Sequence, residues 1–191
     1  MLSFNTVHVL TDSFIHLQRD DRPKPPGEAA LLGTLTLVQD CPSGTSTSDL
    51  RQLSLLHLAL IARRLHTLPA ALNHLAAALT VSSRDVPPDG HLPIDGLDVL
   101  AAALHSQPGQ RLLAWAICYD TVDIDTKRVT PLRRVDAVDA DGRLYQLRRR
   151  PDDNQPTITV DDQPQPSDLP ATYPALAQLA AIRPSPTGGR P

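Results

Sequence analysis

The clearest pattern of apolar positions in the chain lies within residues 111–150. Its first part has the two-residue period of a β-strand. Alternate positions form two sets, one with Leu113, Trp115, Ile117 and Tyr119 and the other with Leu112, Ala114, Ala116 and Cys118. Because both sets are apolar, the pattern predicts a central strand that is covered on both faces.

The rest of this half predicts an antiparallel β-meander of three to four strands. A turn at residues 139–142 separates two runs rich in strand-forming residues, and Gly142 can supply the positive φ angle of a tight hairpin. Thr157–Val160 is typical of a short strand at a sheet edge. The segment Ala175–Ile182 predicts a short returning helix, with Pro174 in its first turn.

In the N-terminal half the spacing of apolar residues is mostly helical. Residues 1–20 repeat apolar positions every three or four residues and predict a helix capped by Ser3, although their β-branched residues also fit a hairpin. Glu28–Val38 shows one apolar face and predicts a short helix interrupted by Gly33. Pro93–Ser106 predicts another helix.

A leucine-rich segment predicts two further helices, Leu50–His66 and Pro69–Thr80. Proline inside a helix removes a hydrogen bond and clashes with the preceding turn, so Pro69 fits the start of the second helix, with Thr67 or Leu68 as its cap. Apolar residues recur at spacings of three and four at Leu58, Ile61, Leu65, Leu68, Leu72, Leu75 and Leu79. We favour a buried core face for this stripe over a dimer seam.

Together these elements predict the α+β class. We expect a helical N-terminal half of three to five helices, then the meander, then the short returning helix. A length of 191 residues suits one domain. We place that domain at residues 1–183, with a loop-rich section at residues 1–47, and expect residues 184–191 to form a disordered Pro/Gly tail.

Composition limits the class and location of the protein. A net charge of -3 gives no general attraction to nucleic acid or to anionic membranes. Of the 18 basic residues 16 are arginine, which with abundant Ala, Pro and Gly is typical of a GC-rich bacterial genome. The longest apolar run, Leu55–Ala62, is far shorter than the roughly 20 residues of a membrane-spanning helix, and no signal-peptide pattern begins the chain. We therefore expect a soluble, cytoplasmic protein, with Cys118 as a small buried hydrophobe.

The chain contains no complete catalytic or cofactor motif, so we expect no cofactor and no enzymatic activity. Residues 139–142 (Asp-Ala-Asp-Gly) resemble the middle of a calcium loop, but Ala137 and Arg148 would occupy its first and last ligand positions. A hairpin turn whose aspartate accepts backbone hydrogen bonds is the better interpretation.

Aspartates at the end of the central strand leave a metal-dependent enzyme as an alternative. Asp120, Asp123 and Asp125 lie two or three residues apart there, and carboxylates at strand ends can hold a divalent cation. Such an activity would depend on Asp120, Asp123 or Asp139. A solvated strand end is the favoured interpretation.

Positive charge is concentrated near the open end of the predicted hairpin. A turn at residues 139–142 places Arg133 and Arg134 across from Arg148 and Arg149, and Arg150 follows. Like charges directly opposite on paired strands are unfavourable, so such arginines must alternate between faces, pair with aspartates or meet an anionic partner. These five arginines are the candidate binding residues for an anionic ligand.

The sequence as a whole favours a small non-enzymatic protein-interaction or accessory module. Its partner would be another protein, or a second copy bound through the leucine-rich helices. The first alternative is a binder of nucleic acid or another anionic ligand through the hairpin arginines. Nucleic acid is disfavoured because the segment Pro69–Thr80 offers no arginine for a base or a phosphate. No membrane partner is expected.

Overall fold

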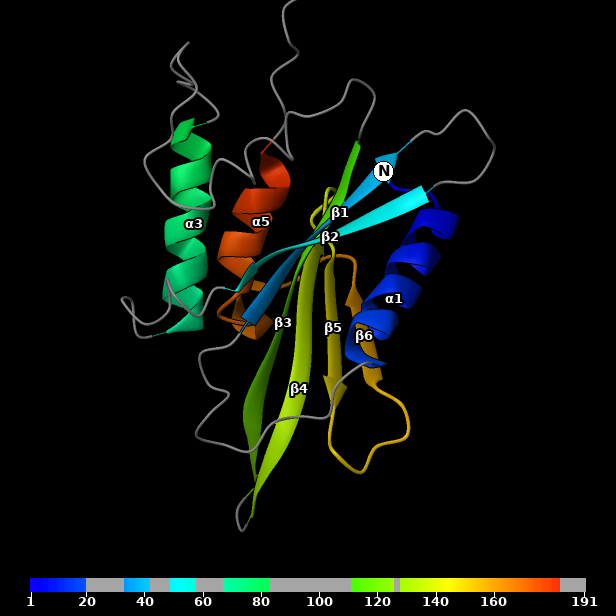
Figure 1. The fold of residues 1–191 in the computed structure, drawn as a ribbon, viewed down its shortest axis with the longest axis vertical. Helices are drawn as coiled ribbons and strands as arrows, with labels where there is room; N and C mark the ends of the chain where they lie inside the picture. The colour runs from blue at the N-terminus through cyan, green and yellow to red at the C-terminus, as the bar shows by residue number, and fades with distance from the viewer. Residues whose placement is uncertain (20–32, 42–48, 58–66, 83–110, 126–127, 183–191) are drawn as a thin grey trace, which may run out of the picture.

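The computed structural model describes residues 1–19, 33–41, 49–57, 67–82, 111–125 and 128–182 (Figure 1). These residues form one six-stranded sheet with helices on both of its faces. In chain order the elements are α1 (Phe4–Arg19), β1 (Gly33–Cys41), β2 (Asp49–His57), α3 (Leu68–Ser82), β3 (Arg111–Asp125), β4 (Arg128–Asp139), β5 (Leu144–Arg149), β6 (Thr157–Asp161), the short 3-10 helix η1 (Pro166–Asp168) and α5 (Tyr173–Ala181).

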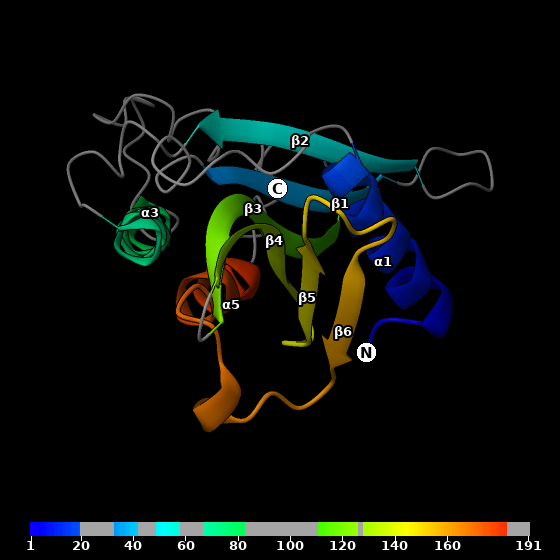
Figure 2. The ribbon, with the colours of Figure 1, turned by 90° about the horizontal axis from the view of Figure 1, so that it is seen from below.

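The strand order is β2-β1-β3-β4-β5-β6, and every neighbouring pair is antiparallel. Strands β3 to β6 form the predicted meander, and the pair β1–β2 continues the sheet beyond β3. Helix α1 packs on one face, here called the α1 face, and α3 and α5 pack on the other, the α5 face (Figures 1 and 2). The α+β class is therefore confirmed.

Strand β3 is the covered central strand that its pattern predicts. Trp115 and Ile117 are buried on the α5 face, and Ala114 and Ala116 are buried on the α1 face. The small alanines let α1 approach the sheet closely, whereas the large side chains fill the space under the two helices opposite.

A bulge near the start of β3 changes the predicted alternation. Val38 of β1 pairs with Ala114 and Gln39 pairs with Leu112, so Leu113 is an extra residue on β3. Leu113 consequently packs on the α1 face, and Leu112 packs on the α5 face with Trp115. The prediction that Leu113 shares a face with Trp115 is wrong, because a strict two-residue period cannot continue through a bulge.

The predicted helical N-terminal half is not shown. The segment expected as a helix at Glu28–Val38 contributes β1, and the one expected at Leu50–His66 contributes β2. Residues 20–32 and 58–66, and the helix expected at Pro93–Ser106, lie outside the described residues. Up to Ser82 the described part of the chain contains two helices, α1 and α3, and the strand pair β1–β2.

Strand pairing explains why those helix predictions failed. Residues 33–38 (Gly-Thr-Leu-Thr-Leu-Val) alternate with period two, although Leu31, Leu35 and Val38 also match a helical spacing. Leucine favours helix in isolation, and this preference is weak enough for tertiary context to override. Here β1 pairs with both β2 and β3, so both of its edges are hydrogen-bonded.

The N-terminal caps of α1 and α3 are those predicted from the sequence. The Ser3 hydroxyl accepts the backbone N–H of Thr6 at 3.2 Å, so residues 4–19 are the predicted helix and not the alternative hairpin. The Thr67 hydroxyl accepts the backbone N–H of Ala70 at 3.3 Å at the start of α3. Each cap satisfies one of the backbone donors that a helix leaves unpaired in its first turn.

The leucines of α3 face the core, as predicted. Leu68, Leu72, Leu75 and Leu79 are all buried. The other three positions of the stripe lie outside the described residues. In the described parts of the chain, no helix is both long enough and apolar enough to cross a membrane.

The C-terminal half agrees closely with its prediction. Gly142 in the β4–β5 turn has a φ of 86°, which residues other than glycine rarely adopt. Strand β6 lies at the sheet edge, and α5 begins with a proline in its first turn. Cys118 packs against the α1-face cluster but is only half-buried, whereas the sequence predicted a buried residue.

The pair β3–β4 is longer than its neighbours. Strand β1 pairs with β3 as far as Tyr119, and β5 pairs with β4 as far as Arg133. Residues 121–125 of β3 and 128–132 of β4 therefore pair only with each other among the described residues. We call these residues the ribbon, and Figure 1 shows it projecting beyond the rest of the sheet.

Candidate functional site

The five arginines singled out from the sequence lie at the base of the ribbon. In the β4–β5 register Arg133 is opposite Arg149, and Arg134 is opposite Arg148. The predicted opposition of like charges is confirmed. Because successive residues alternate between faces, Arg133 and Arg149 lie on the α1 face and Arg134 and Arg148 on the α5 face.

On the α1 face Arg133 forms a buried, bidentate ion pair with Asp120 of β3. Its Nε lies 2.8 Å from Oδ1 of Asp120, and its Nη2 lies 3.0 Å from Oδ2. Both side chains are buried, and the two residues are directly opposite in the β3–β4 register. Two parallel hydrogen bonds between a guanidinium and a carboxylate hold both groups in one orientation.

On the α5 face Arg134 contacts the fully buried carboxylate of Asp136. Nε of Arg134 donates to Oδ1 at 2.7 Å, and the hydroxyls of Tyr119 and Thr172 each donate to Oδ2 at 2.7 Å. The three donors come from β4, β3 and the residue before α5. Asp136 thus connects the sheet to the C-terminal helix, and its carboxylate has three donors in place of water.

The charges around Asp136 act on the neighbouring titratable groups. Burial, together with the Asp136 carboxylate, raises the pKa of Tyr119 well above its ordinary value. Burial alone would lower the pKa of Arg134, but the adjoining carboxylate raises it. Tyr119 therefore stays neutral and Arg134 stays charged throughout the physiological pH range.

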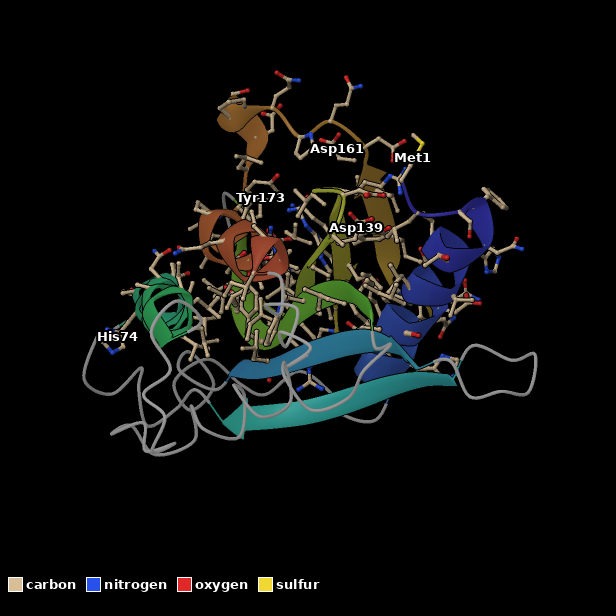
Figure 3. The ribbon with its side chains drawn as sticks, turned by 90° about the horizontal axis from the view of Figure 1, so that it is seen from above. Met1, His74, Asp139, Asp161 and Tyr173 are labelled. Atoms are coloured by element: carbon tan, nitrogen blue, oxygen red, sulfur yellow. The ribbon has the colours of Figure 1, made fainter. Side chains whose placement is uncertain are left out.

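A second fully buried carboxylate, Asp139, organises the β4–β5 turn. Its Oδ1 accepts the backbone N–H groups of Asp141 at 2.9 Å and Arg143 at 3.0 Å, and its Oδ2 accepts the Tyr145 hydroxyl at 2.9 Å. This is the predicted hairpin turn with an aspartate accepting backbone hydrogen bonds. Figure 3 shows Asp139 at the same end of the sheet as Asp161 and Tyr173.

Arg143 links this turn to the end of β6. Its Nε lies 2.5 Å from Oδ1 of Asp162, and its Nη1 lies 3.6 Å from Oδ2 of Asp139. The hydroxyl of Tyr173 donates to the carbonyl of Gly142 at 3.2 Å. The turn is therefore tied both to the edge strand and to the start of α5.

The strand-end aspartates do not converge on one point. Asp120 binds Arg133, and Asp123, three residues later and on the opposite face, lies 2.5 Å from Nη2 of Arg150. Asp139 is occupied by the donors of its own turn. Among the residues that the structure describes, no group of three or more His, Cys, Asp or Glu side chains could hold a metal ion.

The remaining candidate arginines lie on β5 and just after it. Nε of Arg149 donates to the carbonyl of Asp153 at 3.4 Å, and the backbone N–H of Arg150 donates to the Asp153 carboxylate at 2.8 Å. Arg148 is exposed and makes no ion pair within the described part of the chain. Of the five candidate residues, Arg148 is the one most available to an outside anion.

Sequence reasoning found the opposed arginines but missed their polar partners. In the sequence between the two strands, Thr126 and Lys127 carry no turn signal, so the register that places Asp120 against Arg133 could not be derived. Tyr119 was assigned to an apolar face, and nothing in its sequence neighbourhood indicates a carboxylate 17 residues away. Thr172 is 36 residues from Asp136.

The two arginines on paired strands should differ sharply in their effect on stability. Arg133→Ala is expected to lower the free energy of unfolding by about 3–5 kcal/mol, because it removes the bidentate guanidinium partner of the buried Asp120 carboxylate. Arg148→Ala, on the neighbouring strand, should change it by less than about 1 kcal/mol. Urea denaturation of both variants measures the difference, and equal losses would contradict the structural role of Arg133.

The tyrosines predict how stability depends on alkaline pH. Burial and nearby aspartates raise the pKa of all three, Tyr119, Tyr145 and Tyr173. Because the folded-state pKa values exceed the unfolded value of about 10, their contribution is complete below about pH 10 and is lost as pH rises towards the folded-state values. In an ultraviolet titration, phenolate absorbance should appear together with loss of the circular dichroism signal. Formation of more than one phenolate near pH 10 with the fold intact would show that the hydroxyls of Tyr119 and Tyr145 are not both bonded to buried aspartates.

No protein-family model, no curated protein and no solved structure matches this chain. We therefore infer function from its geometry alone. The informative features are the satisfied buried charges, the projecting ribbon and the exposed Arg148.

Proposed function

We propose that the protein is a non-enzymatic protein-interaction module and that the ribbon is its main contact element. The observation that carries this proposal is a pair of exposed apolar residues near the ribbon tip. Ile124 is 75% exposed and Val129 is 60% exposed. They are directly opposite each other in the β3–β4 register, so they form one continuous apolar surface.

The apolar surface extends along one side of the ribbon. Val122 and Pro131 are the next opposed pair and lie on the same face as Ile124 and Val129, two residues closer to the core. The other face carries Thr121, Asp123 and Thr130, with the buried Leu132 at its base. The ribbon is thus amphipathic, and its apolar side suits an apolar groove on a partner protein, whereas its polar side would remain in water.

The base of the ribbon supports this use. The buried Asp120–Arg133 pair holds the two strands where they leave the sheet. Beyond it, the two ribbon strands pair only with each other among the described residues, and a two-stranded hairpin alone is marginally stable in water. A partner that covers the apolar side would supply the missing contacts, so binding and ordering of the ribbon would be coupled.

The polar clusters give less support to a metal-dependent enzyme or to a binder of nucleic acid or another anion. Asp120, Asp136 and Asp139 bind protein donors, and a metal-dependent reaction would require at least some of them to bind a cation. Arg133, Arg134 and Arg150 are paired with carboxylates, which lowers the positive potential available to a nucleic acid or another anion. A protein-interaction module requires neither a metal-binding aspartate nor an anion-binding arginine.

Site-specific photo-crosslinking in cells that produce the protein naturally tests the proposal. A photo-reactive amino acid at position 124 should give a discrete adduct with one protein, because the apolar side of the ribbon is buried in the complex. The same reagent at Asn73, which is exposed on α3, is the matched control and should give no such adduct.

A second variant separates specific from random contact. Val129→Lys, combined with the reagent at position 124, should abolish the adduct while the purified chain keeps its circular dichroism spectrum. An adduct that persists in the Val129→Lys chain, or the absence of any adduct at position 124, would rule out the ribbon as the contact element.

A further inference from the structure

We propose that two copies of this chain associate through β6, so that their sheets join edge to edge into one antiparallel sheet. This inference goes beyond the interaction function of the ribbon, because it concerns a different surface and a different partner. It rests on the exposure of β6, on the symmetry of its sequence and on the charges beside it.

Strand β6 has the properties of an edge that can accept another strand. It pairs with β5 in a continuous register without a bulge, and it is the last strand of the sheet. Residues 157–160 (Thr-Ile-Thr-Val) are all β-branched and exposed, and they include neither proline nor a charged residue. Bulges, prolines and central charges are the usual features that protect an edge strand from pairing, and β6 lacks all three.

The sequence of β6 is complementary to itself in the antiparallel direction. A two-fold axis at Thr159 would place Thr159 opposite its own copy, Ile158 opposite Val160, and Thr157 opposite Asp161. No pair in this register brings like charges together. The arrangement is a closed two-fold dimer in which each copy makes the same contacts.

On the α1 face this register would bury exposed apolar surface. Ile158 is 37% exposed and Val160 is 40% exposed, and they are opposite the buried residues Leu147 and Tyr145 of β5. Across the new junction each Ile158 would contact a Val160 of the other copy. The apolar row of β5 and β6 would then continue from one sheet into the next.

On the α5 face the same register would supply a partner for Arg148. Arg148 is opposite Arg134 on one side and Thr157 on the other, and Asp136 is already bonded to Arg134. In the joined sheet Asp161 of the second copy would stand beside Thr157. With strands about 4.8 Å apart, its Cα would be about 10 Å from that of Arg148, a distance that the two side chains can span over the short threonine.

This ion pair cannot form within one copy. Asp161 and Thr157 are at opposite ends of β6, four residues or about 13 Å apart. Asp161 uses Oδ1 to accept the backbone N–H of Gln163 at 2.9 Å, which leaves Oδ2 to accept from an arginine. The adjacent Asp162 is bound to Arg143 and adds little repulsion. The two-fold axis would form the Arg148–Asp161 pair twice.

Charge at the symmetry axis provides a specific test on the full-length chain. Thr159→Lys and Thr159→Glu each place like charges opposite each other in the proposed dimer, at a site that is exposed in the monomer. Light scattering after size-exclusion chromatography should show a dimer for the original chain and a monomer for each variant. An equimolar mixture of the two variants should recover the dimer, because lysine then faces glutamate.

Control variants separate loss of the junction from loss of the fold. Asn73→Lys adds the same charge on α3 and should leave the dimer intact. Arg148→Glu lies on β5, outside the new backbone pairing, and should also weaken the dimer, with recovery in the double variant Arg148→Glu/Asp161→Lys. Circular dichroism confirms that each variant is folded.

Three results would contradict the proposed dimer. A monomeric original chain at every concentration measured would overturn the proposal. A dimer that persists in folded Thr159→Lys or Arg148→Glu would also overturn it, because the contact would then lie elsewhere. A mixture of Thr159→Lys and Thr159→Glu that stays monomeric would exclude the register centred on Thr159, and with it the proposed junction.

Discussion

The rest of the structure depends on how β4 places charged side chains inside the protein. Asp136 and Asp139 lie on this strand and are fully buried, and Arg133 is buried against Asp120 on the neighbouring strand. A buried charge is tolerated only when opposite charges and hydrogen bonds replace water. Each of these groups finds its donors or acceptors on another element: β3, β5 or the start of α5. The charges therefore specify one register for β3, β4 and β5, because a shift by one residue would turn every side chain to the other face.

Two surfaces, the ribbon and the outer edge of β6, lie beyond the part of the sheet that these buried charges organise. The ribbon extends beyond the Asp120–Arg133 pair, and its exposed apolar side is available for contact with another protein. Strand β6 is at the edge of the described sheet, next to the buried residues of β5. Arg148 is opposite Thr157 of β6, and the Asp136 carboxylate on the same face is engaged by Arg134. Arg148 and the exposed apolar residues of the ribbon and of β6 thus lie outside the network of buried charges.

The sequence predicted the fold where short-range patterns and long-range pairing agree. The meander, the turn at Gly142 and the edge strand β6 follow from the two-residue period and from turn chemistry, and the structure contains all three. The prediction failed for β1 and β2, because their leucine spacing fits a helix and only long-range pairing, of β1 with β3 and of β2 with β1, makes them strands. The bulge at Leu113 shows the same limit, since it depends on the register with β1.

The sequence predicted the candidate site only in part. The opposition of Arg133 and Arg134 to Arg149 and Arg148 follows from the position of one turn. The buried partners do not, because Asp120 requires the β3–β4 register, and Thr172 requires knowledge of how α5 docks on the sheet. The sequence therefore indicated where positive charge gathers, but not which arginines are used internally.

The central claim is that the buried Asp120–Arg133 pair marks the limit of the cooperatively folded sheet. Native-state hydrogen exchange, read residue by residue, tests it most directly. Backbone amides of β3 on the core side, from Ala116 to Tyr119, should exchange only through global unfolding, with one common free energy. Amides of the ribbon, from Thr121 to Ile124, should exchange through local opening at a distinctly lower free energy. If the ribbon amides instead exchange with the same free energy as the core, the ion pair is not a limit and the account is wrong.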